Sequence, residues 1–151
     1  MAVARRLLRE YKSILAARSK DYLVRIEPNN LMLWHVTLFG AKDTPWENGV
    51  FKLDVQIPRD YPMSPPEPVF VGVIPFHPNV YQNGKICLNF LKNDWSEAFG
   101  IESLMTAIIT LLVAPNPDSP ANNTAAKLFT EHQSEYERHV ASCVRRTLET
   151  N

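Results

Sequence analysis

The chain has 151 residues, of which 45% are hydrophobic and 21% charged, as expected for one globular domain. Its formal net charge is +0, which argues against a protein that binds nucleic acid directly through overall positive charge. Its 2 cysteines are too few for a disulfide framework or a cysteine metal cluster, so we expect no metal and a reducing compartment, the cytoplasm, the nucleus or both. No apolar stretch approaches the roughly 20 residues that cross a bilayer, and the N-terminus lacks the apolar core of a signal peptide, so we expect no membrane partner.

Apolar residues recur at helical spacing over residues 3–15, which predicts an amphipathic helix at the start of the chain. Arg5, Arg6, Arg9 and Lys12 lie between the apolar positions and give this helix one basic face. Such a face is either solvated or a docking surface, and the pattern alone favours neither.

Four short extended runs, rich in β-branched and aromatic residues, follow this helix. They cover residues 22–26, 32–39, 50–57 and 69–73. The third run alternates apolar and polar residues, which predicts that Phe51, Leu53, Val55 and Ile57 face the core. The connections are short and carry turn residues, so we expect consecutive strands to pair as an antiparallel meander.

Prolines mark the segment between the third and fourth runs. Pro62, Pro65, Pro66 and Pro68 cannot lie in a helix or in the middle of a sheet. We therefore expect a rigid surface loop at the edge of the sheet, a place where functional residues are common.

The second half of the chain has helical character. A strongly apolar run over residues 101–113 predicts a buried central helix, which the proline-rich segment 114–120 ends. Two further helices are expected over residues 123–129 and 132–150. Residues 1–151 are thus predicted to form a single α+β domain with an N-terminal helix, a four-stranded antiparallel meander, a central helix and C-terminal helices.

Residues 77–89 hold the most informative side chains. Cys87 offers a thiol, which attacks as its thiolate, and the polar turn around Gly84 places it near a loop. Pro78 constrains the backbone before Asn79, and an amide held in such a turn can donate to a developing oxyanion, a role worth roughly 3–4 kcal/mol in other enzymes. The alternative for an isolated cysteine is a small buried hydrophobe.

The arrangement of motifs along the chain resembles that of ubiquitin-conjugating enzymes over nearly its whole length. The pieces, in family order, are the basic N-terminal helix, Trp34, Tyr61-Pro62-Met63-Ser64-Pro65-Pro66, His77-Pro78-Asn79, Ile86-Cys87-Leu88, Trp95-Ser96 and Pro115-Asn116-Pro117. The runs 116–122 and 135–137 are most similar to the branch that includes DNA-repair and histone-ubiquitylating members. We expect no long extension at either end and thus a bare catalytic core.

This resemblance implies roles for four residues near the motif. Cys87 would accept the C-terminus of the modifier as a thioester. Asn79 would stabilise the oxyanion when a substrate lysine attacks, or hold the active-site loop. His77 would be structural, with its ring bonded to the local backbone. Ser119 stands where many members carry an Asp that helps to desolvate or orient the lysine, and a Ser cannot be a carboxylate base.

The resemblance also implies partners and two docking surfaces. The partners are ubiquitin or a ubiquitin-like modifier, an activating enzyme, a ligase and a protein substrate. ATP is used by the upstream activating enzyme, so no cofactor is expected. The activating enzyme would meet Arg5, Arg6 and Arg9. The ligase would meet Met63, Ser96, Glu97 and Ala98, where Glu97 replaces a frequent Pro and could change partner choice.

A second modifier is possible on the same scaffold. Asn89 stands where many members have Asp, and residues 87–95 are similar to those of the enzyme that conjugates the ubiquitin-like modifier of cullins. That enzyme carries an N-terminal arm, which this chain, beginning directly at the helix, is expected to lack, so ubiquitin is the favoured modifier. The two-residue insertion before Trp95 that marks the SUMO-conjugating enzyme is absent.

Two other classes compete with a conjugating enzyme. A cysteine hydrolase would need a His base within hydrogen-bond reach of Cys87. A non-catalytic binding module of the same fold would lack the active-site cysteine, whereas Cys87 and Asn79 are both present. The second cysteine, Cys143, is expected to be a packing residue on the last helix.

Overall fold

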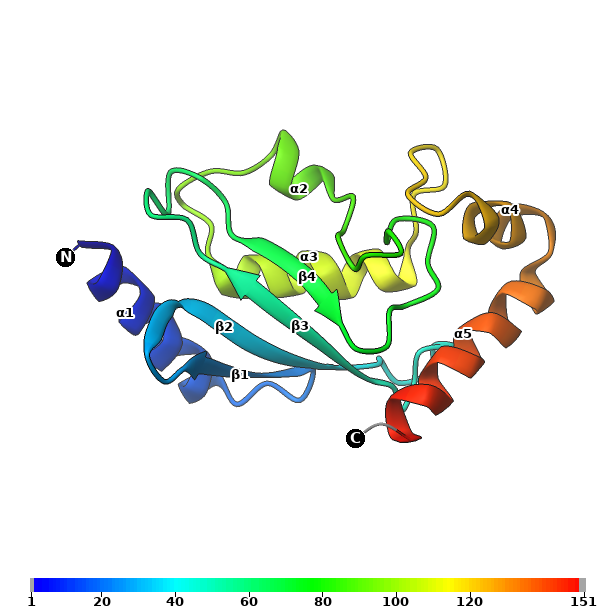
Figure 1. The fold of residues 1–151 in the computed structure, drawn as a ribbon, viewed down its shortest axis with the longest axis horizontal. Coiled ribbons are helices and arrows are strands. Elements are labelled where there is room, and N and C mark those ends of the chain that lie inside the picture. Colours follow the sequence, from blue (N-terminus) through cyan, green and yellow to red (C-terminus); the bar gives the residue numbers. More distant parts are fainter. Residues whose placement is uncertain (1, 150–151) are drawn as a thin grey trace.

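The computed structural model describes residues 2–149. Helix α1 leads into a four-stranded antiparallel sheet in the order β1-β2-β3-β4, and further helices follow (Figure 1). In chain order the elements are α1 (Ala2–Ala17), β1 (Tyr22–Glu27), β2 (Asn30–Phe39), β3 (Val50–Gln56), β4 (Glu67–Val71), α2 (Asn89–Lys92), α3 (Ile101–Val113), α4 (Asn123–Glu131) and α5 (Gln133–Glu149). The predicted α+β fold, with its meander sheet and its central and C-terminal helices, is confirmed.

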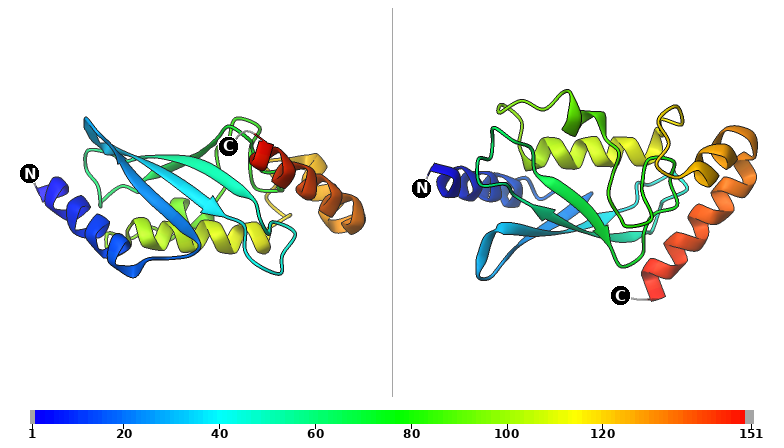
Figure 2. Two further views of the ribbon diagram at one scale, coloured as in Figure 1. Left: turned by 90° about the horizontal axis from the view of Figure 1, so that it is seen from below. Right: turned by 45° about the horizontal axis from the view of Figure 1, so that its top comes forward.

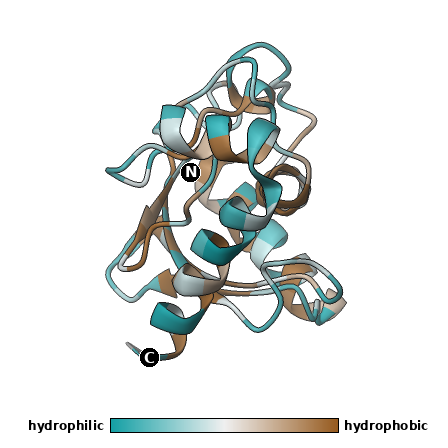
Figure 3. Ribbon diagram, turned by 90° about the vertical axis from the view of Figure 1, so that its right-hand side faces the viewer, coloured by the Kyte–Doolittle hydropathy of each residue, from teal (hydrophilic) through white to brown (hydrophobic). Residues whose placement is uncertain are grey.

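The helices cover the sheet on one face and at its two ends. Helix α3 lies across one face, α1 contacts α3 and β1, and α4 and α5 lie at the opposite end of the molecule from α1 (Figures 1 and 2). Figure 3 looks onto that opposite end, where hydrophilic and hydrophobic residues alternate along the helices as in amphipathic helices that bury one face. Within residues 2–149, no helix is long and apolar enough to span a bilayer.

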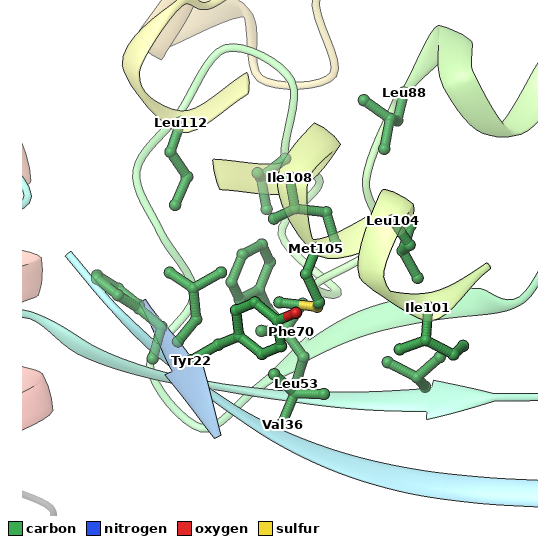
Figure 4. Packing of buried hydrophobic residues seen from close by; sticks show 14 of the residues in the cluster. Tyr22, Val36, Leu53, Phe70, Leu88, Ile101, Leu104, Met105, Ile108 and Leu112 are labelled. Atoms are coloured by element: carbon green, nitrogen blue, oxygen red, sulfur yellow. The ribbon is translucent and has the colours of Figure 1, made fainter. Parts of the chain in front are cut away.

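The core forms between the sheet and α3. Val36, Leu53 and Phe70, from three neighbouring strands, are each 1% exposed and pack toward Met105 and Ile108 of α3 (Figure 4). The predicted alternation in β3 is confirmed, because its apolar positions are buried while the polar ones between them are not. Burial of each such side chain contributes about 1.5–3 kcal/mol, which makes this layer the rigid base of the molecule.

The sequence prediction differs from the structure in the fourth strand and in one short helix. The fourth strand was expected to start at Val69 but begins at Glu67, and Pro68 lies inside it opposite Val55. β4 tolerates a proline because it is an edge strand of this sheet. Helix α2 was not predicted, since four residues are too few to show a helical period.

Glu10 of α1 fastens three parts of the chain. Its Oε1 accepts a hydrogen bond from the backbone N–H of Ile101, at 2.8 Å, where α3 begins. Its Oε2 accepts from the hydroxyl of Tyr61 at 2.7 Å and from Nε of Arg6 at 2.8 Å. The carboxylate thus satisfies a donor that the helix leaves unpaired at its N-terminus, where negative charge is favourable. A Cβ at Gly100 would lie 2.3 Å from Oε1, so a larger residue there would displace the Glu10 carboxylate from this position.

Candidate active site

A tight turn places Cys87 against the edge of the sheet. The N–H of Tyr81 donates to the carbonyl of Lys85 at 2.9 Å, and the N–H of Gly84 donates back to the carbonyl of Tyr81 at 2.9 Å. Gly84 has a φ of +91°, and a Cβ there would lie 2.0 Å from the carbonyl oxygen of Phe70 in β4. Only glycine fits both conditions, and the predicted turn before Cys87 is confirmed.

Cys87 is a free, partly exposed thiol at the end of this turn. The ammonium of Lys92, the last residue of α2, donates to its Sγ at 3.5 Å. Sequence reasoning placed Lys92 in a segment of interest but missed this contact, because it depends on the unpredicted turn of helix that brings the two side chains together.

Asn79 joins Cys87 to the loop that follows α3. Its backbone carbonyl accepts from the N–H of Cys87 at 2.8 Å. Its buried side chain donates from Nδ2 to the carbonyls of Asn116 and Ser119, at 2.7 and 3.2 Å, and accepts from the N–H of Asn116 at 2.8 Å. Both amide hydrogens are therefore engaged within the chain. This geometry fits the second of the two implied roles, that of holding the loop.

Ser119 lies on the loop that Asn79 holds, and its side chain is exposed. The same loop is fastened a second time, because the carbonyl of Pro78 accepts from the N–H groups of Ala121 and Asn122 at 2.7 and 3.0 Å. Residues 116–122 are thus hydrogen-bonded to residues 78 and 79 at both ends of the loop. These bonds fix the position of the Ser119 backbone.

His77 is fully buried, and its ring bonds to one local backbone group and to one that is 34 positions away. Nε2 donates to the carbonyl of Leu111 at 2.8 Å, and Nδ1 accepts from the N–H of Asn79 at 2.9 Å, which assigns the hydrogen to Nε2. Burial lowers the pKa of His77 to about 4, because charging the ring would require desolvation. A neutral ring with both nitrogens engaged holds α3 against the cysteine segment and is not free to act as a base.

The described residues give the thiol no hydrogen-bonded histidine that could act as a base for hydrolysis. Among residues 2–149, the hydrogen bonds of Cys87 include none to a histidine. His35 bonds to Glu27 and Asp54 across the sheet, and His139 stacks on Phe76 at 4.5 Å. The described residues also hold no group of three or more His, Cys, Asp or Glu side chains placed to bind a metal ion.

The three arginines expected to meet the activating enzyme differ in their surroundings. Arg5 and Arg9 are exposed. Arg6 is instead bound within the chain, since it donates to the carbonyl of Phe99 at 2.6 Å and to that of Glu97 at 3.2 Å besides its ion pair with Glu10. Arg6 thus clamps α1 to the loop before α3, while Arg5 and Arg9 are exposed, and contact of the three with the activating enzyme stays a prediction.

The four residues expected to meet a ligase lie on two loops that are joined to each other. Nε1 of Trp95 donates to the carbonyl of Pro62 at 2.9 Å, which ties the proline-rich loop to the loop that follows Trp95. Met63 is 74% exposed on the first loop. The second loop carries the other three, all exposed: Ser96, Glu97 and Ala98. The Trp95 hydrogen bond therefore joins the two loops that carry these four residues.

An accessible thiol beside a fastened loop, with no histidine bonded to it in the part of the chain that the structure describes, fits a group transferase better than a hydrolase. The family model described as "Ubiquitin-conjugating enzyme" matches residues 6–144. Ubiquitin-conjugating enzyme E2 3 of Arabidopsis thaliana is 48% identical over 118 residues, which cover 78% of this chain and 78% of the relative. Ubiquitin-conjugating enzyme E2 2 of Candida glabrata is 40% identical over 147 residues, which cover 97% of this chain and 87% of the relative. The chain belongs to the ubiquitin-conjugating enzyme family, whose members are transferases that work with a modifier, an activating enzyme and ligases.

Proposed function

We propose that Cys87 carries ubiquitin as a thioester and passes it to a lysine of a protein substrate. The observation that supports this most is the contrast between the two cysteines: Cys87 is partly exposed at the end of a fixed turn, whereas Cys143 is 2% exposed in α5. A nucleophile must be reachable by the thioester of the activating enzyme, and a side chain buried in a helix interface is not.

The reaction consists of two acyl transfers. In the first, the thiolate of Cys87 attacks the thioester carbonyl presented by the activating enzyme, a new C–S bond forms, and the thiolate of the activating enzyme leaves. In the second, an unprotonated lysine amine attacks the carbonyl, a C–N bond forms, and Cys87 leaves as a thiolate that takes up the proton lost by the amine. ATP is used upstream, so this chain needs no cofactor of its own.

Residues around the thiol would position these steps. Asn79 holds the loop of Ser119 beside the cysteine segment, so it would shape the place where the substrate lysine enters. Arg5 and Arg9 would contact the activating enzyme through their charge. The ligase would dock on the surface formed by Met63, Ser96, Glu97 and Ala98.

A charging assay with substituted cysteines tests the proposal. Cys87→Ser should trap a reductant-resistant oxyester, because an alkoxide is a poorer leaving group than a thiolate. Cys143→Ser should charge normally. A reductant-sensitive adduct that persists in Cys87→Ala would contradict the assignment. The same assay with a panel of activating enzymes tests the modifier, and charging by the cullin-modifier pathway alone would replace ubiquitin in this proposal.

A further inference from the structure

A cation lies against the sulfur of the candidate nucleophile. Nζ of Lys92 donates to Sγ of Cys87 at 3.5 Å. The two residues are five positions apart, and α2 brings them together. The turn of α2 is closed by a hydrogen bond from the N–H of Leu91 to the carbonyl of Leu88 at 3.0 Å. The contact therefore follows from a local hydrogen-bonded turn.

The turn that carries Lys92 is anchored to the core. Leu88, which precedes it, is 8% exposed. The ring of Phe90 packs against Trp95 and Phe99, with centroid distances of 5.7 and 5.1 Å. The side chain of Lys92 is itself exposed and hydrogen-bonded to the sulfur. Its backbone is thus held in place, which limits the positions that its ammonium can take.

Both acyl transfers of the proposed function place negative charge beside this sulfur. When the carbonyl carbon is attacked, the electron pair of its C=O bond moves to oxygen, and an oxyanion forms two bonds away from Sγ. When the C–S bond breaks in the transfer to lysine, the bonding pair stays on sulfur, which leaves as a thiolate. Donors aimed in advance at such charge are often the largest single contribution to catalysis. A donor beside Sγ would therefore stabilise both transfers.

The amide of Asn79, the other candidate donor, is already engaged. Its Nδ2 donates to the carbonyls of Asn116 and Ser119 at 2.7 and 3.2 Å. An amide has two N–H donors, so Asn79 could act on an oxyanion only by breaking one of these bonds. The ammonium of Lys92 has three donors and directs one of them at Sγ. It can therefore donate to a carbonyl oxygen next to the sulfur without breaking any bond of Asn79.

We propose that Lys92 is a catalytic residue, whose ammonium stabilises negative charge on Sγ and on the adjacent carbonyl oxygen. This inference rests on the proposed function, because that charge arises only in thioester chemistry. In charging, Cys87 forms the new C–S bond and the thiolate of the activating enzyme leaves. In discharge, the amine forms a C–N bond, and Cys87 leaves as a thiolate that takes up the proton lost by the amine. Lys92 keeps its own proton throughout.

The expected effect is moderate because Lys92 is exposed. Loss of one oxyanion donor in a site closed to water slows other enzymes by roughly 10²–10³. A charge in contact with water contributes less, so we expect a loss of about three- to tenfold. Salt should reduce this difference, because dissolved ions screen an exposed charge.

Three variants of the full chain test this inference. Lys92→Met removes the charge but keeps an unbranched side chain, and Lys92→Arg restores a cation. Lys85→Met removes an exposed cation two residues before the cysteine and is the matched control. The first measurement is alkylation of the free thiol by iodoacetamide, a neutral reagent that a cation does not attract. The second is single-turnover discharge of preformed ubiquitin thioester to hydroxylamine, an acceptor that is largely uncharged near pH 7.

We expect Lys92→Met to slow both reactions about three- to tenfold at low salt and less at high salt, with the free energy of unfolding unchanged. Lys92→Arg should recover at least about half of the lost rate, because its guanidinium is also a charged donor. Lys85→Met should stay within about twofold of the wild type. A role of Lys92 in folding alone would not produce this dependence on charge and salt.

The outcomes separate this inference from the proposed function. If the wild type forms no thioester, the proposed function is wrong, and the role of Lys92 in acyl transfer is wrong with it. If the wild type is charged and Lys92→Met is alkylated and discharged at the wild-type rate, the role of Lys92 alone is overturned. A loss that Lys92→Arg does not recover, that Lys85→Met reproduces, or that is equal at low and high salt would overturn it as well.

Discussion

Asn79 connects the two segments that meet at the candidate site, and its removal should weaken both the fold and the site. Asn79→Ala leaves the partly buried backbone groups of Asn116 without their partners and frees the carbonyl of Ser119. We expect the free energy of unfolding to fall by about 1–3 kcal/mol, measured with denaturant. Asn79→Asp should cost more, because it points a carboxylate at two carbonyl oxygens.

The same variant distinguishes the two roles of Asn79. If its amide holds the loop, the loss of discharge to free lysine should accompany the loss of stability, and charging should be affected as well. An Asn79→Ala enzyme of wild-type stability that charges normally but discharges roughly 10²–10³ times more slowly would favour direct oxyanion stabilisation instead.

His77 should make the stability of the protein depend on pH below neutrality. Its pKa is lowered to about 4 by burial, whereas the unfolded chain has an ordinary value near 6.5, so the unfolded state binds the proton more readily. The contribution of the neutral His77 ring to the free energy of unfolding is therefore fully present above pH 6.5. It is lost as the pH falls toward 4, and the total loss is about 3 kcal/mol. Denaturant unfolding between pH 7 and 4 measures this.

His35 provides an internal comparison with the opposite sign. Its ring nitrogens lie 3.0 and 2.8 Å from Glu27 and Asp54, and hydrogen bonds to these carboxylates, first that of Glu27, raise its pKa. The contribution of His35 to the free energy of unfolding is fully present below its pKa in the unfolded chain. It is lost as the pH rises through its pKa in the folded protein. His35→Gln should thus lower the free energy of unfolding by a constant amount below pH 6.5, with the difference from the wild type disappearing as the pH rises through the folded pKa, and it should leave the acid slope of His77 in place. A flat profile between pH 7 and 4 would contradict the role given to His77.

Ser119 places a hydroxyl where the resemblance to the family implied an Asp in many members. Its backbone is fixed by Asn79, so a new side chain there would project from a defined point of the loop. We expect Ser119→Asp to speed discharge to free lysine several-fold near neutral pH, where the amine is mostly protonated and benefits from a nearby carboxylate. Ser119→Asn is the uncharged control. An Asp variant no faster than the Asn variant would show that this position does not assist the lysine.

At the scale of elements, the arginines of α1 should have two different roles, one in docking and one in stability. Arg5 and Arg9 are exposed, so the double variant Arg5→Glu, Arg9→Glu should slow charging about tenfold or more and leave both stability and discharge of preformed thioester unchanged. Arg6→Ala should instead lower the free energy of unfolding by about 1–2 kcal/mol, because it removes hydrogen bonds to Glu97 and Phe99. Equal effects of the two changes on charging and stability would contradict this division.

The elements that could be predicted are those with a local pattern. The alternation in β3 and the helical spacing in α1 and α3 gave these elements with bounds close to the observed ones, because each buries one face over many residues. Helix α2 is a single turn and has no such face. Its contact between Lys92 and Cys87 could have been found only by assuming a helical turn directly after the cysteine.

The candidate site could be predicted only in part, for a similar reason. The motif identified Cys87, Asn79 and His77, but their partners lie far along the chain. Asn79 bonds to residues 37 and 40 positions away, and His77 to Leu111, 34 positions away. Such pairings depend on how the loop after α3 returns to the sheet, which no local pattern encodes. The binding of Arg6 to the loop before α3 was missed for the same reason.

At the scale of the whole molecule, α1 is joined through Glu10 to both loops of the expected ligase surface. Glu10 bonds to Tyr61, one residue before the proline whose carbonyl Trp95 binds, and to Arg6, which holds the carbonyls of Glu97 and Phe99. The segment of Cys87 is fastened separately, through Asn79. Within the described residues, these hydrogen bonds form two sets that share no residue, one joining α1 to the two loops and one joining the Cys87 segment to the loop after α3.

Removing Glu10 should disturb the first set of hydrogen bonds and leave the second intact. Glu10→Ala deprives the largely buried hydroxyl of Tyr61 and the N–H of Ile101 of their acceptor, so we expect the free energy of unfolding to fall by about 2–4 kcal/mol. Hydrogen exchange should accelerate in residues 60–63 and 96–99 but not in 79–87, and ligase-stimulated discharge should fall while unstimulated discharge stays within about twofold. Glu131→Ala, at the exposed end of α4, is the control and should change stability by less than about 0.5 kcal/mol. If hydrogen exchange accelerated equally around Cys87, the two sets of hydrogen bonds would be coupled, and this prediction would be wrong.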